Sequence, residues 1–219
     1  MIPHGVTDYP STLKLSDTIL DALYSLYLND EFLGTCFAIA PRVLISAGHH
    51  YSVTKDFTDH FNIRDAHNDD VIVATYLSKD RAHDVLIIWV QRDLRCVPLR
   101  GFLPPVHARV VTVWLSTKVP HDPILSPSVV IESGADGCLA KGTVSMTGSS
   151  GAPVVDFFGD HVVGMHLTSN TRNGSRVSGF LPARTILSIL IDLEVKCRWE
   201  TGDNAAKPGR KRKWRRKLE

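Results

Sequence analysis

The segment "MTGSSGAPVVDF", residues 146–157, places two adjacent serines between glycines. A serine hydroxyl is a weak nucleophile until a base removes its proton, so a hydrolytic serine needs a histidine, which usually needs an orienting carboxylate. The chain offers a candidate for both roles. His49 follows the apolar run "RVLIS" through a turn of small residues, and Asp84 stands directly before the apolar run "VLIIWV". A carboxylate at the mouth of such a strand becomes partly buried and needs a partner.

The glycines around the two serines indicate which of them is the nucleophile. Negative charge that develops on an attacked carbonyl has to be met by preorganised backbone N–H groups. Two such donors converge only in a tight turn, which glycine permits. We therefore predict Ser150, rather than Ser149, as the nucleophile. The oxyanion hole is predicted in the backbone of Gly148, Ser149 and Ser150, with the N–H groups of Gly148 and Ser150 as donors.

Taken singly, each of these motifs also occurs in ordinary turns and loops. Together they follow the order His, Asp, Ser with gaps of 35 and 66 residues. Since a Ser-His-Asp arrangement is defined by geometry, the prediction requires that the fold bring these three side chains into one cleft.

The composition is that of a folded protein. The chain has 219 residues, of which 43% are hydrophobic and 22% charged, enough for one substantial core or two small ones. It contains no run of eighteen apolar residues, and its start lacks the pattern of a secretory signal, so we expect neither a membrane span nor secretion. Four dispersed cysteines (Cys36, Cys96, Cys138 and Cys197) favour a reducing compartment over a disulfide framework or a zinc site.

Short runs rich in Val and Ile, separated by turn residues, predict an all-β sandwich or barrel. Two segments look helical. The first, "SDTILDALYSL", has Ser16 as its candidate cap, although a strand at "ALYSLYL" would shorten it. The second covers residues 182–196, where a proline precedes an apolar stripe. The proline-bearing segment 98–107 is the best candidate for a link between two halves.

Four blocks carry a resemblance to a known family: "GTCFAIAPRVLISAGHH", "HDVLIIWV", "TGSSGAPVV" and "VVGMHL". They resemble the signature blocks of the chymotrypsin-like serine peptidases over about residues 20–195. The resemblance implies two six-stranded antiparallel barrels with a cleft between them and a C-terminal helix. It also implies His49 as general base, Asp84 as its orienting group and Ser150 as nucleophile, with no cofactor.

The resemblance also sets the expected domain limits. We expect a first barrel in residues 1–97, a linker in 98–107, a second barrel with its helix in 108–196, and a flexible basic tail in 197–219.

Two departures from the family pattern indicate which members of the family the chain resembles. Secreted members usually carry a cysteine after the histidine, but this chain has His50 there, so Cys36 lacks that partner. The residue before the nucleophile is usually an aspartate used in zymogen activation, and here it is Ser149. Both departures favour intracellular, constitutively folded members of the family, either viral polyprotein proteases or bacterial peptidases. The spacing from Thr143 to Gly151 resembles the protease domains of sobemovirus-like viral polyproteins, which would place the protein in the host cytoplasm.

The resemblance also suggests a specificity pocket that accepts Glu or Gln. His166 and Ser145 occupy the positions from which family members of this kind contact the substrate side chain. An imidazole and hydroxyls can hydrogen-bond a carboxylate or carboxamide without a full positive charge. The predicted substrate-binding residues are Ser145, Thr147, His166, Leu167, Thr168 and Ser169. A core histidine between strands is the alternative reading of His166.

Residues 207–219 hold eight Lys or Arg and one Glu, and the rest of the chain holds 17 basic and 22 acidic residues. Such a segment can contact RNA phosphates, act as a localisation signal or simply be solvated. If the enzyme cuts after Glu, the bond between Glu200 and Thr201 is a candidate self-cleavage site, although any linker can contain a glutamate.

Two further alternatives concern function. The adjacent His49 and His50 could suggest a metal, but neighbours on an extended segment point to opposite sides, so we expect no metal site. The rival to an endopeptidase acting on polypeptides is an inactive protease-like fold that serves as an RNA-binding or scaffold module through its basic tail.

Overall fold

The first half of the chain forms a closed antiparallel barrel with the strand order β1-β2-β3-β6-β5-β4. The computed structural model describes residues 15–51, 61–68, 70–118, 121–172 and 174–193. The strands of this barrel are β1 (Leu23–Leu28), β2 (Glu31–Ala40), β3 (Val43–Ala47), β4 (Phe61–Asp65), β5 (Val71–Asp80) and β6 (Val85–Val90).

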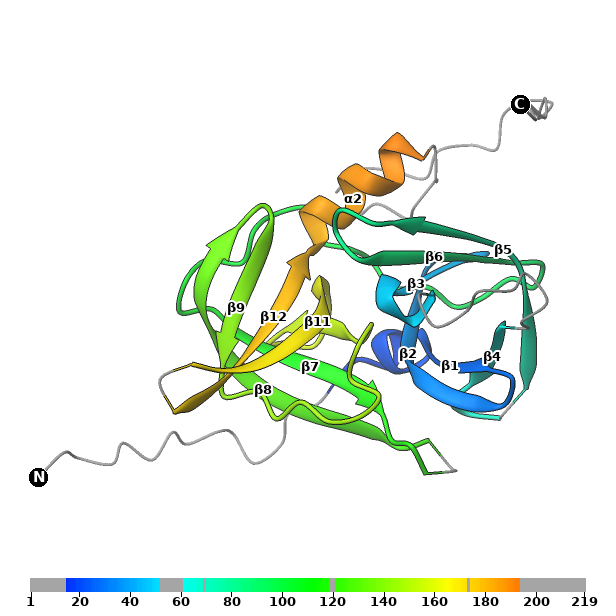
Figure 1. The fold of residues 1–219 in the computed structure, drawn as a ribbon, viewed down its shortest axis with the longest axis horizontal. Coiled ribbons are helices and arrows are strands. Elements are labelled where there is room, and N and C mark those ends of the chain that lie inside the picture. The colour runs from blue at the N-terminus through cyan, green and yellow to red at the C-terminus, as the bar shows by residue number, and fades with distance from the viewer. Residues whose placement is uncertain (1–14, 52–60, 69, 119–120, 173, 194–219) are drawn as a thin grey trace, which may run out of the picture.

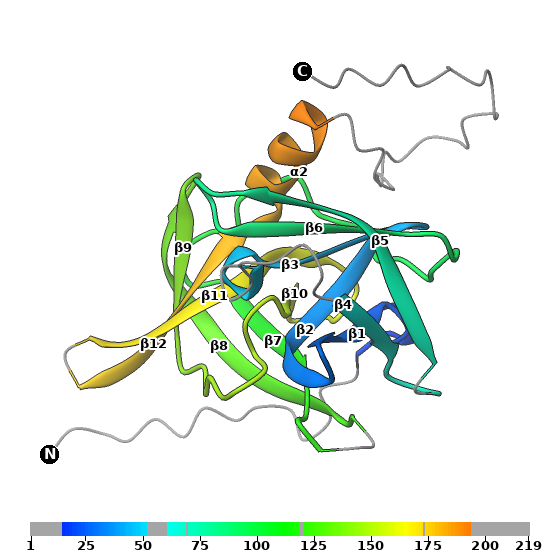
Figure 2. The same cartoon turned by 45° about the vertical axis from the view of Figure 1, so that its right-hand side comes forward.

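The second half forms another closed antiparallel barrel, with the order β10-β11-β12-β9-β8-β7. Its strands are β7 (Arg109–Leu115), β8 (Pro123–Gly134), β9 (Gly137–Lys141), β10 (Pro153–Asp156), β11 (Val162–Arg172) and β12 (Ser175–Pro182). Figure 1 shows the barrels side by side, and Figure 2 shows them turned by 45°. The predicted fold, two six-stranded antiparallel barrels with a C-terminal helix, is confirmed.

Local sequence explains the connections that matter for the site. Asn29 and Asp30 both have positive φ, 49° and 66°, which suits the two-residue turn between β1 and β2. At the end of β3 the chain enters the short 3₁₀ turn η1 (Gly48–Tyr51). The hairpin that joins β5 to β6 delivers Asp84 directly before the buried strand β6. The two turns that carry His49 and Asp84 therefore lie at the same end of neighbouring strands, because β3 pairs with β6 from Ala47 and Val85 onward.

One hydrophobic core joins the two barrels. It combines buried residues of the first barrel, such as Phe37 and Ile87, with residues of the second, such as Val113 and Met165. Each barrel also has a smaller core of its own. Because a shared core fixes the barrels against each other, side chains from both can form one site.

Two α-helices complete the described part of the chain. The first, α1 (Asp17–Leu20), is short and is followed by β1, so the segment "SDTILDALYSL" is helical only in its first part and ends in the strand. The hydroxyl of its N-cap residue, Ser16, does not cap the helix but donates to the Gly159 carbonyl oxygen at 3.0 Å. The second, α2 (Ala183–Asp192), buries an apolar stripe in the shared core.

The segment between the barrels, residues 98–107, forms no strand, apart from an isolated bridge from Leu99 to Val162. The Arg100 N–H also donates to the Val162 carbonyl oxygen at 2.8 Å, which ties the segment to β11. Within the described part of the chain, no helix has the length and apolar character needed to cross a membrane.

Candidate active site

The first barrel supplies a hydrogen-bonded pair of titratable side chains. Nδ1 of His49, on η1, lies 2.7 Å from Oδ2 of Asp84. Both side chains are partly exposed, 43% for His49 and 35% for Asp84. A carboxylate at this nitrogen fixes the orientation of the imidazole and stabilises its protonated form, which leaves Nε2 to exchange a proton with another group.

Close backbone packing holds this pair together. The Gly48 N–H donates to the Asp84 carbonyl oxygen at 2.6 Å. A Cβ on Gly48 would come within 2.9 Å of Asp84 Oδ1, so no larger residue fits there without a shift. Asp84 has φ 56°, a left-handed conformation that is uncommon outside glycine and frequent at functional sites.

The second barrel supplies the serines, and their environments differ. Ser149 is buried, with 2% of its surface exposed, and its hydroxyl lies 2.9 Å from Ser145 Oγ. Ser150 is partly exposed. A hydroxyl that is buried and already hydrogen-bonded is a poor candidate for attack on a substrate, so the environments favour Ser150 as the nucleophile.

In the same turn, the backbone N–H groups of the predicted oxyanion hole differ in whether they form a hydrogen bond within the protein. Gly148 adopts φ 93° and Gly151 adopts φ 80°. The Ser149 N–H donates to the Met146 carbonyl oxygen at 3.0 Å, so it is engaged in the turn itself. Over the described residues, the N–H groups of Gly148 and Ser150 donate no hydrogen bond within the protein. These two donors are therefore not engaged by another group of the described structure.

The turn that carries Ser150 packs against the segment that leads to His49. A Cβ on Gly151 would overlap Ser46 Oγ and would lie 2.8 Å from the Ala47 nitrogen at the end of β3. At Gly34, a Cβ would lie 2.7 Å from His50 Cε1 and 2.9 Å from the Ser150 carbonyl oxygen. Glycine at both positions allows this close approach between the two barrels.

The side chains of His49 and His50 do not have the relative orientation that we expected. The prediction that His49 and His50 point to opposite sides was wrong, because η1 is a helical turn and not an extended segment. Their ring centroids are 4.8 Å apart in an edge-to-face arrangement. Burial, together with the neighbouring His49, lowers the pKa of His50 to about 4. Its Nδ1 lies 3.1 Å from Ser46 Oγ.

The predicted specificity residues are only partly brought together. His166 is buried, and its Nε2 lies 3.3 Å from Ser145 Oγ. Burial, with a smaller contribution from His49, lowers the pKa of His166 to about 4, so the ring is neutral near pH 7. Its Nδ1 is buried without a hydrogen-bond partner in the described structure.

The other predicted members of the pocket lie further out. Thr147 is exposed in the turn before Ser150, and Thr168 and Ser169 are exposed on β11. Leu167 packs against the shared core. Neither Thr147 nor Ser169 has a described hydrogen bond to the pair formed by Ser145 and His166. Glu200, Thr201 and the basic segment 207–219 lie outside the described residues.

Sequence reasoning missed several residues that line the same region. Thr35, on β2, hydrogen-bonds the Gly148 carbonyl oxygen, and the Phe32 ring lies against Gly148. Phe32 also stacks on His121, whose Nε2 lies 2.6 Å from the Tyr27 hydroxyl. A single threonine inside the apolar run "FLGTCFAIA" was the one signal available, because polar residues in such runs need partners.

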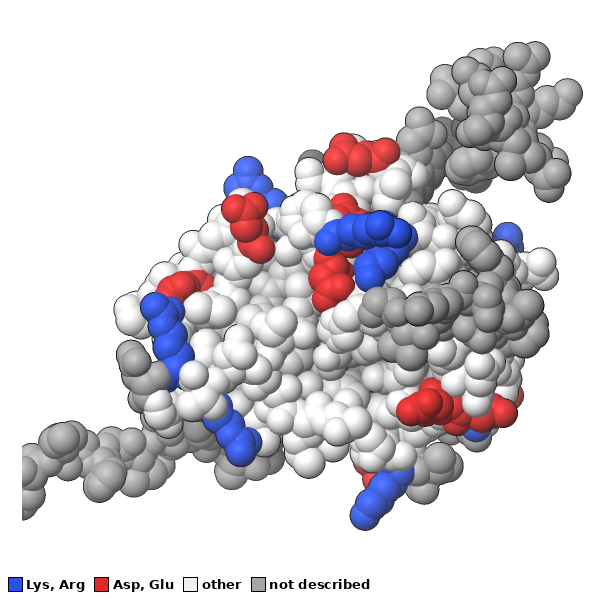
Figure 3. Space-filling model, in the orientation of Figure 1, with Lys and Arg blue, Asp and Glu red and all other residues white. Residues whose placement is uncertain are grey.

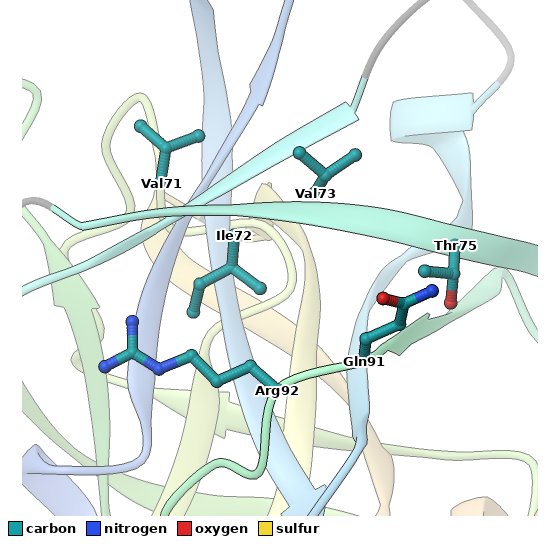
Figure 4. A pocket seen from close by; sticks show the side chains of 6 residues that line it. All are labelled: Val71, Ile72, Val73, Thr75, Gln91 and Arg92. Carbon is teal, nitrogen blue, oxygen red and sulfur yellow. The ribbon is translucent and has the colours of Figure 1, made fainter.

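Two further features concern the surface of the molecule. Figure 3 shows a face on which charged side chains of both signs lie near the edges and in one cluster in its upper part, with an uncharged area below that cluster. A shallow pocket, drawn in Figure 4, lies by the end of β6 opposite Asp84. It is lined by Val71, Ile72, Val73, Thr75, Gln91 and Arg92.

Cysteines and metal ligands can be assigned only in the described part of the chain. Cys36, Cys96 and Cys138 are free thiols, and burial raises the pKa of Cys36 well above its usual range. Within the described residues, no group of three or more His, Cys, Asp or Glu side chains is arranged to hold a metal ion.

No protein-family model matches this sequence, and no curated protein matches it. Solved structures of the Rv3671c protease from M. tuberculosis are similar to it. The active form is 18% identical with a TM-score of 0.64, and the alignment covers 81% of this chain and 83% of that one. The inactive form is 17% identical with a TM-score of 0.63, covering 80% and 89%.

A serine-to-alanine mutant of the same protease, in its inactive form, is 16% identical with a TM-score of 0.64, covering 80% of this chain and 88% of that one. At such identities the likeness shows the fold. The chain therefore has the double-barrel fold of the chymotrypsin-like serine peptidases.

Proposed function

We propose that this chain is a serine endopeptidase that uses Ser150, His49 and Asp84. His49 takes the proton from Ser150 Oγ as the oxygen attacks the substrate carbonyl. Asp84 stabilises the imidazolium that forms, and the N–H groups of Gly148 and Ser150 stabilise the oxyanion. His49 then gives its proton to the leaving amine, and water releases the acyl group from Ser150 by the same steps.

One observation carries this proposal. His49 forms a 2.7 Å hydrogen bond with Asp84, and it lies on η1, directly after β3. The end of β3 is in close contact with the turn that carries Ser150. A carboxylate-oriented histidine, on a segment that packs against the turn of a partly exposed serine, supports activation of that hydroxyl.

Reaction with a fluorophosphonate probe tests the proposal. We expect the wild type to be labelled on Ser150, and the Ser150→Ala and His49→Ala variants to remain unlabelled. Ser116→Ala, which changes a partly exposed serine directly after β7, serves as the matched control and should be labelled like the wild type. Absence of labelling in folded wild-type protein would overturn the proposal and favour a scaffold role.

We propose further that the enzyme cuts after Glu or Gln. The support is a neutral His166 that shares a hydrogen bond with Ser145, since such a pair can donate to a carboxylate or a carboxamide. A peptide-library scan should show Glu or Gln before the cleaved bond. Ser145→Ala should reduce that preference by about tenfold, and a preference for basic or aromatic residues would contradict this assignment.

The biological role that fits this specificity is viral polyprotein processing in the host cytoplasm. The support is the sequence pattern described above, including Glu200–Thr201 and the basic segment that follows. Mass spectrometry of wild type and Ser150→Ala tests it: we expect a product ending at Glu200 only in the wild type. An intact chain in both would exclude self-cleavage at this bond.

The basic segment 207–219 is proposed to contact RNA through its lysine and arginine side chains. Binding of a single-stranded RNA should weaken steeply with salt and should be lost in a chain that ends at residue 206. Equal binding by the two chains would contradict this.

A further inference from the structure

We propose that Thr35 is a positioning residue for the oxyanion hole, acting from the first barrel on a loop of the second. The inference rests on the proposed peptidase function. Thr35 lies in β2 and is fully buried, with 0% of its surface exposed. Its polar atoms therefore need partners inside the protein.

Those partners belong to the other barrel. The Thr35 hydroxyl accepts the Leu115 N–H at 3.0 Å and donates to the Gly148 carbonyl oxygen at 2.9 Å. Because the Leu115 N–H can only donate, the single hydroxyl proton is directed at Gly148. The Thr35 N–H also donates to the same carbonyl oxygen, at 3.1 Å. Two donors of one residue thus hold one carbonyl group.

These two hydrogen bonds fix the orientation of the peptide plane that lies between the two proposed oxyanion donors. Gly148 supplies one donor and Ser150 the other, and the held carbonyl lies in the peptide that follows Gly148. Gly148 adopts φ 93°, and the Phe32 ring leaves no room for a Cβ there. Rotation of this peptide would break the two hydrogen bonds from Thr35 and the one from the Ser149 N–H to the Met146 carbonyl oxygen. Each buried group left unpaired costs about 1–3 kcal/mol.

Thr35 also contacts the segment that leads to His49. Its carbonyl oxygen accepts the Ser46 hydroxyl at 2.9 Å, and that hydroxyl lies 3.1 Å from His50 Nδ1. The same carbonyl oxygen lies 2.5 Å from the place of a Cβ on Gly151. Thr35 is therefore in contact with the loop of the nucleophile and with the strand of the base.

Kinetics of three variants test the proposal. Thr35→Val keeps the shape of the side chain and removes its hydroxyl, and Thr35→Ser keeps the hydroxyl. Thr112→Val makes the same change at another buried threonine, on β7. Removal of one direct oxyanion donor lowers kcat by about 10²–10³-fold, so for this indirect role we expect a loss of about 10–100-fold in Thr35→Val.

Two further readouts separate positioning from loss of folded protein. KM should stay within about twofold. Affinity for a peptide aldehyde, which adds to the serine hydroxyl as a tetrahedral hemiacetal with its oxygen toward the oxyanion hole, should fall in parallel with kcat. Thr35→Ser should recover most of kcat, and Thr112→Val should keep it. A kcat that falls only in proportion to the unfolded fraction, or equally in Thr112→Val, would overturn the proposal.

Hydrogen exchange gives a test that does not depend on activity. In a Ser150→Ala background, Thr35→Val should accelerate amide exchange at Leu115 and in residues 146–151, and Thr112→Val should leave the second segment unchanged. Unchanged exchange there after Thr35→Val would contradict the proposed role of the Thr35 hydrogen bonds. If the wild type resists the fluorophosphonate probe, the peptidase assignment fails, and the exchange data still decide whether Thr35 holds this loop.

Discussion

The two barrels contribute to the site in different ways. The first supplies side chains that can carry charge, His49 and Asp84, and leaves both partly exposed. The second supplies backbone N–H groups, hydroxyls and a buried histidine, His166, whose pKa is lowered to about 4. Charge is therefore concentrated on one side of the site, and neutral hydrogen-bonding groups on the other.

This difference has a physical reason. A proton-accepting pair has to change its charge during a reaction, and water contact lowers the cost of that change. Groups that meet a developing negative charge work best when they are fixed in advance, which small residues and buried hydrogen bonds achieve. Each barrel thus has the kind of structure that its proposed task requires.

We expect the largest effect from a substitution in the first barrel, which supplies the charged side chains. Asp84→Asn should lower kcat by about 10³–10⁴-fold, because the neutral amide no longer stabilises the protonated form of His49. Asp80→Asn is the matched control, since Asp80 faces His83 in the same hairpin, and it should keep kcat within about twofold. Steady-state hydrolysis of a peptide ester measures both, and a modest loss in Asp84→Asn would argue against the assigned role.

We expect the next largest effect from a substitution that disturbs the contact between the two barrels. Gly151→Ala should lower the free energy of unfolding by about 4 kcal/mol, because its φ is positive and the new Cβ would meet backbone atoms of Thr35 and Ala47. Gly174 also has positive φ, 71°, but open space around it, so Gly174→Ala should cost only about 1 kcal/mol. Urea denaturation compares the two, and equal losses would mean that close packing at Gly151 is unimportant.

We expect the smallest effect from the two buried histidines, whose lowered pKa values make the stability depend on pH. His50 and His166 have pKa values of about 4 when folded, below the ordinary 6.5. Between pH 6.5 and 4 the unfolded chain binds these protons and the folded protein does not, so stability falls as the pH is lowered through this window and levels off below it. Each histidine contributes about 3 kcal/mol to that fall.

Denaturation of wild type, His50→Gln and His166→Gln at several pH values measures this contribution. The difference between wild type and each variant removes the common effect of the carboxylates. Each variant should lose less stability than the wild type between pH 6.5 and 4. A slope that neither substitution changes would show that these histidines are protonated in the folded state.

Much of the architecture could be predicted from the sequence. Short Val- and Ile-rich runs separated by turn residues indicated strands, and the four signature blocks indicated two six-stranded barrels. The stripe after Pro182 predicted a helix, which the structure places at Ala183–Asp192. Only Asp17–Leu20 of the first predicted helix is helical, because the segment from Leu23 onward pairs with β2 and β4 and local helical preference does not outweigh that pairing.

The site was only partly predictable. His49, Asp84 and the two serines stood out because each occupies a turn beside a strand. Thr35, Phe32 and Gly34 did not, because their roles depend on contacts with residues more than a hundred positions away. The orientation of His49 relative to His50 was also missed, since a single 3₁₀ turn after β3 changes the direction of both side chains.

The sequence by itself determined which residues can carry the chemistry and that the chain forms strands, because residue type and alternation are local properties. The tertiary structure decided which serine is buried, which histidines have a lowered pKa and which threonine forms hydrogen bonds from one barrel to the other. Those properties depend on burial and on hydrogen bonds between distant segments, and only the packed barrels bring these segments into contact.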